Sequence, residues 1–156
     1  MDLTINREDI QMDTIRVMKL KENAILPTYG SAEAAGADLY ACLDAPVQIE
    51  PGKTVFIPTG LAMEIPKGCA GLIYARSGLA CKKGLAPANK VGVIDSDYRG
   101  EFIVALHNHG SESQTVCHGE RVAQLVITPV LTPAYENVEQ LSETARAAGG
   151  FGSTGK

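Results

Sequence analysis

Short runs of apolar and β-branched residues recur along this chain, and turn-forming residues separate them. Pairs such as Pro51-Gly52, Thr59-Gly60 and His118-Gly119 stand between consecutive runs. Short strands at this spacing favour a β-sandwich or a barrel of the jelly-roll type. The pattern predicts strands at Ile15–Leu20, Ala37–Cys42, Val47–Ile49, Lys53–Pro58, Leu61–Ile65, Ala70–Ala75, Val91–Ile94, Phe102–His107, Thr115–Cys117 and Arg121–Val130.

One stretch, Ser77–Lys83, instead predicts a short helix, with Ser77 as its N-cap and Gly84 as its end. The C-terminus has a different composition, because Gly149–Lys156 contains four glycines in eight residues. Ordering each residue of such a tail costs about 1–2 kcal/mol. We therefore expect one all-β domain over residues 1–140 and a flexible C-terminal arm over residues 141–156.

The composition is that of an ordinary globular domain, with 156 residues, 45% of them hydrophobic and 21% charged. A formal net charge of −4 argues against a nucleic-acid-binding surface. No apolar run reaches membrane-spanning length or resembles a signal peptide. The four cysteines are widely spaced and form no CxxC pair, which favours reduced thiols in a cytoplasmic protein. His107 and His109 would share one strand face, but no third residue has a convincing spacing for a metal site.

The segment from Val91 to Leu106 has the pattern of a candidate site. Two apolar runs, Val91–Ile94 and Phe102–Leu106, flank a polar turn with two carboxylates, which predicts a β-hairpin. Asp95 stands where the first run stops, so that a rigid strand would hold it at a pocket as a candidate general base. The alternative is an ordinary hairpin, since turns prefer Asp and Ser.

Four other segments carry polar groups at positions where apolar runs begin or end. Asp38 follows a turn glycine at the start of a strand, and Gln124 lies near the start of another. Arg76 precedes the expected helix, where free N–H groups and a guanidinium suit a phosphate. Arg146 and Phe151 stand in or beside the glycine-rich tail. Each also has a purely structural explanation when taken alone.

In this order, the segments resemble the five motifs of the trimeric deoxyuridine triphosphate nucleotidohydrolases (dUTPases). The motifs read A-G-A-D-L-Y-A, R-S-G-L-A, G-V-I-D-S-D-Y-R-G, G-E-R-V-A-Q-L and R-A-A-G-G-F-G-S-T-G. Asn89 falls where the family has its uracil-side asparagine. The chain departs from the usual motifs at Ala75, where the family usually has proline, and at Ala147, where it usually has glycine. The resemblance runs from about Ile15 to Lys156.

The resemblance implies an all-β, jelly-roll-like (β-clip) subunit in a homotrimer with three active sites between subunits. It implies hydrolysis of dUTP to dUMP and pyrophosphate, which removes dUTP from the nucleotide pool and supplies dUMP for thymidylate synthesis. Asp95 matches the general base that activates a water for attack on the α-phosphorus. Mg²⁺ would bridge the phosphates, and Asp38 matches a carboxylate that meets this ion through water.

The resemblance also assigns the nucleotide-binding positions. Tyr98 would pack on the deoxyribose and exclude a 2′-hydroxyl, and Phe151 would stack on uracil when the arm closes over the site. The substrate-binding residues that it implies are Arg76, Ser77, Gly78, Asn89, Gly92, Val93, Ile94, Tyr98, Ile103, Gln124, Arg146, Phe151, Gly152, Ser153 and Thr154.

Two other functions are compatible with parts of this pattern. A dCTP deaminase shares the fold, but its proton-shuttling Glu would stand at Ala105, and no carboxylate occurs in Phe102–Leu106. A nucleotide-binding trimer without turnover would be expected to lack the base, the phosphate arginine or the tail. This chain keeps Asp95, Arg76 and the tail, so that the hydrolase is the favoured interpretation.

Overall fold

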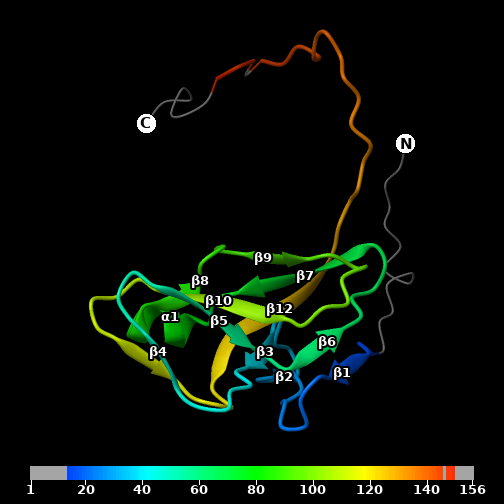
Figure 1. Cartoon of the computed structure of the whole chain (residues 1–156). Helices are drawn as coiled ribbons and strands as arrows, with labels where there is room; N and C mark the ends of the chain where they lie inside the picture. The colour runs from blue at the N-terminus through cyan, green and yellow to red at the C-terminus, as the bar shows by residue number, and fades with distance from the viewer. Residues whose placement is uncertain (1–13, 146, 150–156) are drawn as a thin grey trace.

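The computed structural model describes residues 14–145 and 147–149. Nearly all regular structure in this part of the chain is β (Figure 1). The elements in chain order are β1 (Val17–Lys19), β2 (Thr28–Tyr29), β3 (Ala37–Tyr40), β4 (Val47–Ile49), β5 (Thr54–Pro58), β6 (Leu61–Met63), β7 (Cys69–Tyr74), α1 (Ser77–Lys83), β8 (Leu85–Pro87), β9 (Gly92–Ile94), β10 (Ile103–Asn108), β11 (Gln114–Val116) and β12 (Arg121–Pro129).

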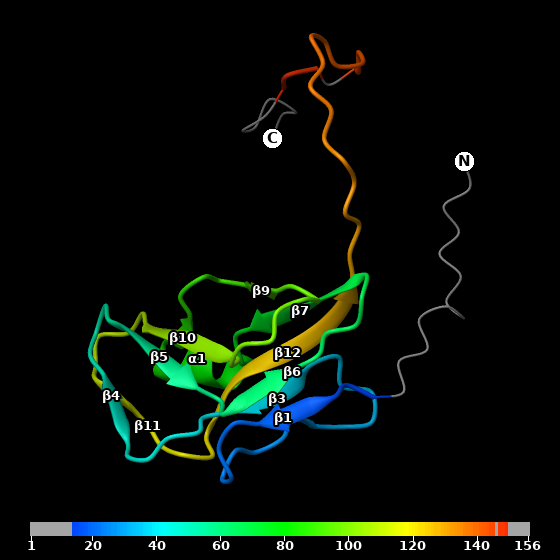
Figure 2. The ribbon, with the colours of Figure 1, turned by 45° about the vertical axis from the view of Figure 1, so that its right-hand side comes forward.

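The strands form antiparallel sheets around one core, in an all-β, jelly-roll-like fold. The largest sheet has the order β2-β3-β12-β7-β9, with the long strand β12 in its middle (Figure 2). A second sheet has the order β5-β10-β8, and two further pairs are β1-β6 and β11-β4. Leu39 and Leu125 from the first sheet join Ile57 and Leu106 from the second in one buried cluster.

Strand β10 shows how the residue pattern places the core. Val104, Leu106 and Asn108 are buried, while the alternate residues Ile103 and His107 are at least partly exposed. This alternation follows from the two-residue repeat of a strand. Asn108 is tolerated in the core because its amide donates to the carbonyl oxygens of residues 49 and 112, both at 2.8 Å.

All ten strands expected from the sequence are present, with ends shifted by at most two residues. The pattern missed β2 and β8. Strand β2 is only two residues long, and both are exposed. Strand β8 ends in Pro87 and lies at the edge of its sheet, where a missing N–H is tolerated. Neither strand is long enough to show an alternation of apolar and polar residues.

The predicted hairpin between residues 91 and 106 is wrong. Strand β9 pairs with β7, whereas β10 pairs with β5 and β8 in a different sheet. The eight residues between β9 and β10 therefore carry the chain from one sheet to the other. Phe102 at the end of this connection is fully buried, so that it anchors the connection in the core shared by both sheets.

Helix α1 has the predicted bounds, but its N-cap differs from the prediction. Arg76 occupies the N-cap with extended backbone angles and makes no side-chain capping bond, and Ser77 is already helical. Gly84 ends the helix in the left-handed conformation, with φ of 66°. A Cβ at Gly84 would lie 2.8 Å from the backbone nitrogen of Gly110, so that both φ and space require glycine.

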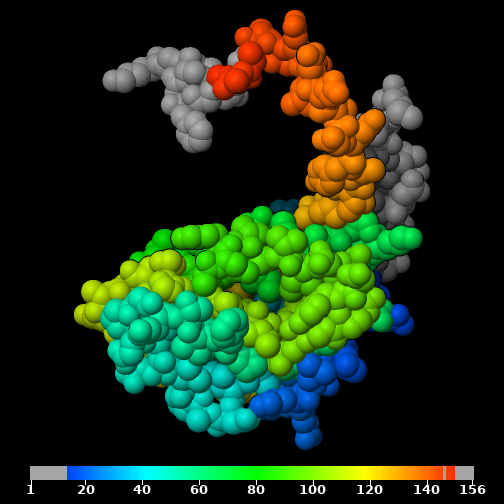
Figure 3. All heavy atoms as spheres, turned by 45° about the horizontal axis from the view of Figure 1, so that its top comes forward, coloured from blue at the N-terminus to red at the C-terminus, as the bar shows by residue number. Residues whose placement is uncertain are grey.

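After β12 the chain leaves the body of the molecule (Figure 3). Residues 131–145 form no strand, and three apolar side chains in this segment are largely exposed: Leu131, Tyr135 and Leu141.

The cysteines Cys42, Cys69, Cys81 and Cys117 are all free. No helix in the described residues has the length and apolar character needed to cross a membrane.

Candidate active site

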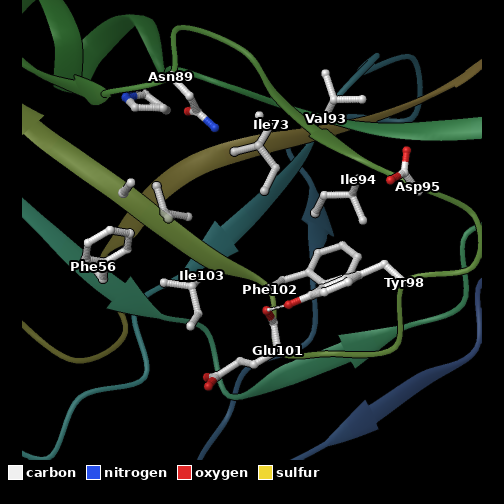
Figure 4. A pocket seen from close by; sticks show the side chains of 14 residues that line it. Phe56, Ile73, Asn89, Val93, Ile94, Asp95, Tyr98, Glu101, Phe102 and Ile103 are labelled. Carbon is white, nitrogen blue, oxygen red and sulfur yellow. Dashed lines mark hydrogen bonds between the residues drawn. The ribbon is translucent and has the colours of Figure 1, made fainter.

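A hollow of about 360 Å³ lies beside β9, the connection after it and β10 (Figure 4). We call it the β9–β10 hollow. Its walls are largely apolar, with Phe56 72% exposed on one side and Val93 65% exposed on another. The structure brings together here seven of the residues that the sequence singled out: Asn89, Gly92, Val93, Ile94, Asp95, Tyr98 and Ile103.

Strand β9 offers main-chain groups to this hollow. It lies at the edge of its sheet and pairs only with β7, so that one edge has no strand partner in the described part of the chain. Gly92 lets the amide of Asn89 approach the strand, because a Cβ there would lie 3.1 Å from Asn89 Nδ2 and 3.2 Å from Ile73 Cβ. The hollow therefore combines free peptide groups with one side-chain amide.

Asp95 directly follows β9, and its side chain is exposed at the edge of the hollow. Hydrogen bonds within the following turn fix its backbone. The amide of Tyr98 donates to the carbonyl of Asp95 at 3.2 Å, and Arg99 Nη1 donates to the carbonyls of Ser96 and Tyr98 at 2.8 and 2.9 Å. A carboxylate that is held by its backbone yet accessible can act on a bound water.

Tyr98 is held in place from two sides. Its ring lies 6.2 Å from that of Phe102, and its hydroxyl donates a 3.0 Å hydrogen bond to the carbonyl of Glu101. Gly100 leaves the space that the ring fills, because a Cβ at this position would overlap the Tyr98 hydroxyl. The ring is thus fixed in a wall of the hollow, and 44% of the residue remains exposed.

A second hollow, of about 460 Å³, lies between α1 and the start of β12. We call it the α1 hollow. Four cationic side chains and one carboxylate, Glu120, contribute to its lining, together with two glycines and apolar residues. No residue lines both hollows. The polar and glycine residues that line the α1 hollow are Arg76, Gly78, Lys82, Lys83, Gly119, Glu120 and Arg121.

Asp38 stands behind the α1 hollow as a buried carboxylate, 4% exposed, on β3. Its Oδ1 accepts a 2.6 Å hydrogen bond from Arg76 Nε, and its Oδ2 accepts one of 3.3 Å from Arg121 Nη1. Gln124 lies directly opposite Asp38 in the β3–β12 ladder. The first, second and fourth sequence motifs therefore meet at this carboxylate.

Arg121 is a residue that the sequence reasoning missed. It stands in the quoted motif G-E-R-V-A-Q-L, where only Gln124 was singled out. The sequence shows that Arg121 precedes Gln124 by three residues. It does not show the irregular register of the β3–β12 pairing between residues 121 and 123. Of the other expected positions, Ser77 and Gln124 line neither hollow. Arg146, Phe151, Gly152, Ser153 and Thr154 lie outside the described residues.

A bound metal would find few ligands in the chain itself. No group of three or more His, Cys, Asp or Glu residues that could hold a metal occurs in residues 14–145 and 147–149. Asp38 lies behind a cationic hollow whose lining contains one further carboxylate, Glu120. This donor set fits a hard cation that arrives with phosphates and keeps most of its waters, as Mg²⁺ does.

The dUTPase family model matches residues 22–155, which is most of the chain. The chain belongs to the dUTPase family. Curated relatives include the deoxyuridine 5′-triphosphate nucleotidohydrolase of Syntrophotalea carbinolica, 50% identical over 142 residues (91% of this chain, 97% of the relative). That of Desulfitobacterium hafniense is 56% identical over 131 residues (83% of this chain, 87% of the relative).

Solved structures of dUTPases share the fold. The dUTPase of Staphylococcus bacteriophage 80alpha, determined with dUpNHpp, has a TM-score of 0.84 and 30% identity, covering 93% of this chain and 100% of the phage chain. The dUTPase of Staphylococcus aureus phage phi11 has a TM-score of 0.76 and 28% identity, covering 85% and 100%. Both comparisons agree with the family assignment.

Proposed function

We propose that the chain hydrolyses dUTP to dUMP and pyrophosphate. The observation that carries this proposal is membership of the dUTPase family, with relatives of that name at 50–56% identity over most of the chain. The structure supports it with a largely apolar hollow beside a free strand edge and with a separate cationic hollow. The apolar hollow suits a nucleoside, and the cationic hollow suits a triphosphate.

The β9–β10 hollow is the proposed nucleoside site. Uracil presents acceptor, donor and acceptor groups along its edge, which the peptide groups of Gly92–Ile94 and the Asn89 amide can match. Cytosine presents a different order and would leave buried groups unpaired, which can cost a factor of roughly 10⁴. The fixed ring of Tyr98 is proposed to pack on the deoxyribose and to leave no room for a 2′-hydroxyl, with Ile103 also touching the nucleotide.

Asp95 is the proposed general base. Its carboxylate accepts a hydrogen bond from a water, orients it and takes its proton as the water oxygen attacks the α-phosphorus. The new P–O bond forms as the bond to the departing pyrophosphate breaks. A positioned base of this kind typically contributes about 10²–10⁴ in rate.

The α1 hollow is the proposed phosphate site. Asp38 holds Arg76 through Nε, which leaves the terminal nitrogens of the guanidinium for phosphate oxygens. Ser77, Gly78 and Gln124 are also proposed to contact the phosphates. Asp38 would hold Mg²⁺ through water, and the ion would neutralise charge on the phosphates.

The proposed assembly is a homotrimer, as the resemblance to the trimeric dUTPases implies. No residue of one chain lines both its nucleoside hollow and its phosphate hollow, which suits a site shared between subunits. Each complete site then takes its nucleoside half from one subunit and its phosphate half from another. Residues 1–140 are the proposed domain and 141–156 an arm from the third subunit. Arg146 would meet the terminal phosphate, Phe151 would stack on the base, and Gly152, Ser153 and Thr154 would contact the nucleotide.

A cytoplasmic location is part of this proposal, resting on the widely spaced, free cysteines.

The test is release of pyrophosphate from dUTP, UTP, dTTP and dCTP by the purified full-length chain. We expect turnover of dUTP and little of the other three. Release of ammonia from dCTP would instead indicate a deaminase, although β10 carries no carboxylate and Ala105 lines the hollow. Binding of dUTP without pyrophosphate release would indicate a binding protein.

A further inference from the structure

The α1 hollow extends past the residues that the motifs account for. Gly78 lines it from the first turn of α1, and Lys82 and Lys83 line it from the last turn. The seven residues of the helix span about 10 Å at about 1.5 Å per residue. Cationic groups therefore line this hollow from both ends of the helix, rather than only beside Arg76.

The charges in this hollow are unevenly paired. Arg76 and Arg121 share the buried carboxylate of Asp38, and Lys83 Nζ lies 3.7 Å from Glu120 Oε1. Lys82 is exposed and takes part in no ion pair within the described residues. Its ammonium group is an uncompensated positive charge at the wall of a hollow, in a chain whose net charge is −4.

We propose that Lys82 is a further substrate-binding residue, which binds the pyrophosphate part of the nucleotide from the far end of the α1 hollow. This rests on the proposed dUTP hydrolysis and adds to it a residue outside the five motifs. An ammonium group is a compact point charge on a flexible stem, and it can follow phosphate oxygens through substrate binding and product release. A role in substrate capture also follows, because a cleft in which positive charge predominates attracts an anionic ligand.

A purely structural role would have a different signature. Lysines in the last turn of a helix interact favourably with the negative end of its dipole, and Lys82 is placed to do so. Loss of that interaction would lower the thermal midpoint of the protein and would leave the affinity for pyrophosphate unchanged. The two roles are therefore separable by measuring binding and stability on the same variant.

The experiment compares Lys82→Gln with Lys67→Gln, which removes the same charge from an exposed position that does not line the α1 hollow. The probe is inorganic pyrophosphate in magnesium buffer, titrated into the full-length protein by calorimetry. We expect Lys82→Gln to weaken pyrophosphate binding about fivefold. The KM for dUTP should rise by a similar factor with kcat little changed. The difference should shrink toward about 1 M salt, where the Debye length is about 3 Å.

Lys82→Arg keeps the charge and should restore most of the affinity. Equal pyrophosphate affinity in Lys82→Gln and Lys67→Gln would overturn the proposal, as would a loss of affinity that persists at high salt. If the wild-type protein does not hydrolyse dUTP, the proposed function fails by that result alone. The calorimetric comparison with pyrophosphate still decides the role of Lys82 in that case.

Discussion

Arg76 Nε donates a 2.6 Å hydrogen bond to Oδ1 of Asp38, a carboxylate that is almost fully buried on strand β3. The pair joins residues 38 positions apart in sequence, and Arg121 adds a second guanidinium to the other oxygen. Arg76 thus reaches the α1 hollow in a fixed orientation, because a group behind the wall holds it there.

Asp38→Asn should remove that fixed orientation. The substitution keeps the shape but leaves two guanidinium groups without their counter-charge. Breaking a buried ion pair costs about 3–5 kcal/mol. The side chains of Arg76 and Arg121 remain 22% and 51% exposed, so that we expect about 2–3 kcal/mol less stability against denaturant. Asp44→Asn, which breaks an exposed pair with Lys21, is the matched control and should leave the unfolding midpoint unchanged.

Asp95→Asn should separate binding from chemistry. The amide keeps the size of the side chain but cannot take a proton from water, so that kcat should fall by about 10²–10⁴. Affinity for a non-hydrolysable dUTP analogue, measured by calorimetry, should stay close to that of the wild type. Asp97→Asn is the control in the same turn, and a larger loss of kcat there would assign the base to Asp97.

Gly100→Ala should displace the Tyr98 ring, which is proposed to pack on the deoxyribose. A methyl group at this position meets the Tyr98 hydroxyl and ring, so that the ring must move. We expect a lower kcat/KM for dUTP and a discrimination against UTP that falls by about tenfold. Tyr98→Phe loses only the hydrogen bond to the Glu101 carbonyl and should retain the discrimination. An unchanged ratio of kcat/KM for dUTP and UTP in Gly100→Ala would contradict the proposed role of the ring.

Deletion of Gly149–Lys156 should lower turnover sharply and leave the fold of the body intact. Stacking of an aromatic ring on a base contributes about 1–3 kcal/mol, and a closed arm would exclude water from the phosphates. Steady-state kinetics and the thermal midpoint of the truncated protein provide the measurement. Phe151→Trp should keep more activity than Phe151→Ala, and unchanged kcat and KM after truncation would rule out the closing arm.

His109 should titrate below its ordinary pKa of 6.5. Partial desolvation lowers its pKa most, and positive charge on His107 and Lys90 adds to the effect. The two imidazole rings lie 4.4 Å apart. Between the lowered pKa and 6.5 the unfolded chain binds more protons, so that this residue's contribution to stability is lost as the pH falls through that range. NMR titration of the ring checks the direction, and His107→Gln should raise the pKa of His109 toward its ordinary value.

The sequence predicted the longer strands because their alternation reflects burial on one face, as in β10. It could not predict which strands pair. A segment such as residues 95–102 can join two strands of one hairpin, or it can carry the chain from one sheet to another. Local turn chemistry in Asp95-Ser96-Asp97 does not distinguish these cases. Only the buried side chain of Phe102 and the register of β9 with β7 decide between them.

The sequence singled out half of the residues that line the β9–β10 hollow and two of those that line the α1 hollow, but not how they are held. That Asp38 orients Arg76 depends on the β3–β12 register, which brings residues 38 and 124 opposite each other. The space for Tyr98 depends on Gly100, a residue that carries no chemistry of its own. Such supporting positions follow from contacts across the fold, which a linear pattern does not contain.

The separation of the two hollows within one chain has a consequence for mixed populations. In the proposed assembly, a chain that lacks Asp95 still presents an intact Arg76, and a chain that lacks Arg76 still presents an intact Asp95. Two inactive alleles expressed in one cell would then complement each other. Activity would return in each active site that combines the intact Arg76 of one chain with the intact Asp95 of the other. Conversely, one defective copy would silence a pocket that belongs partly to its neighbour.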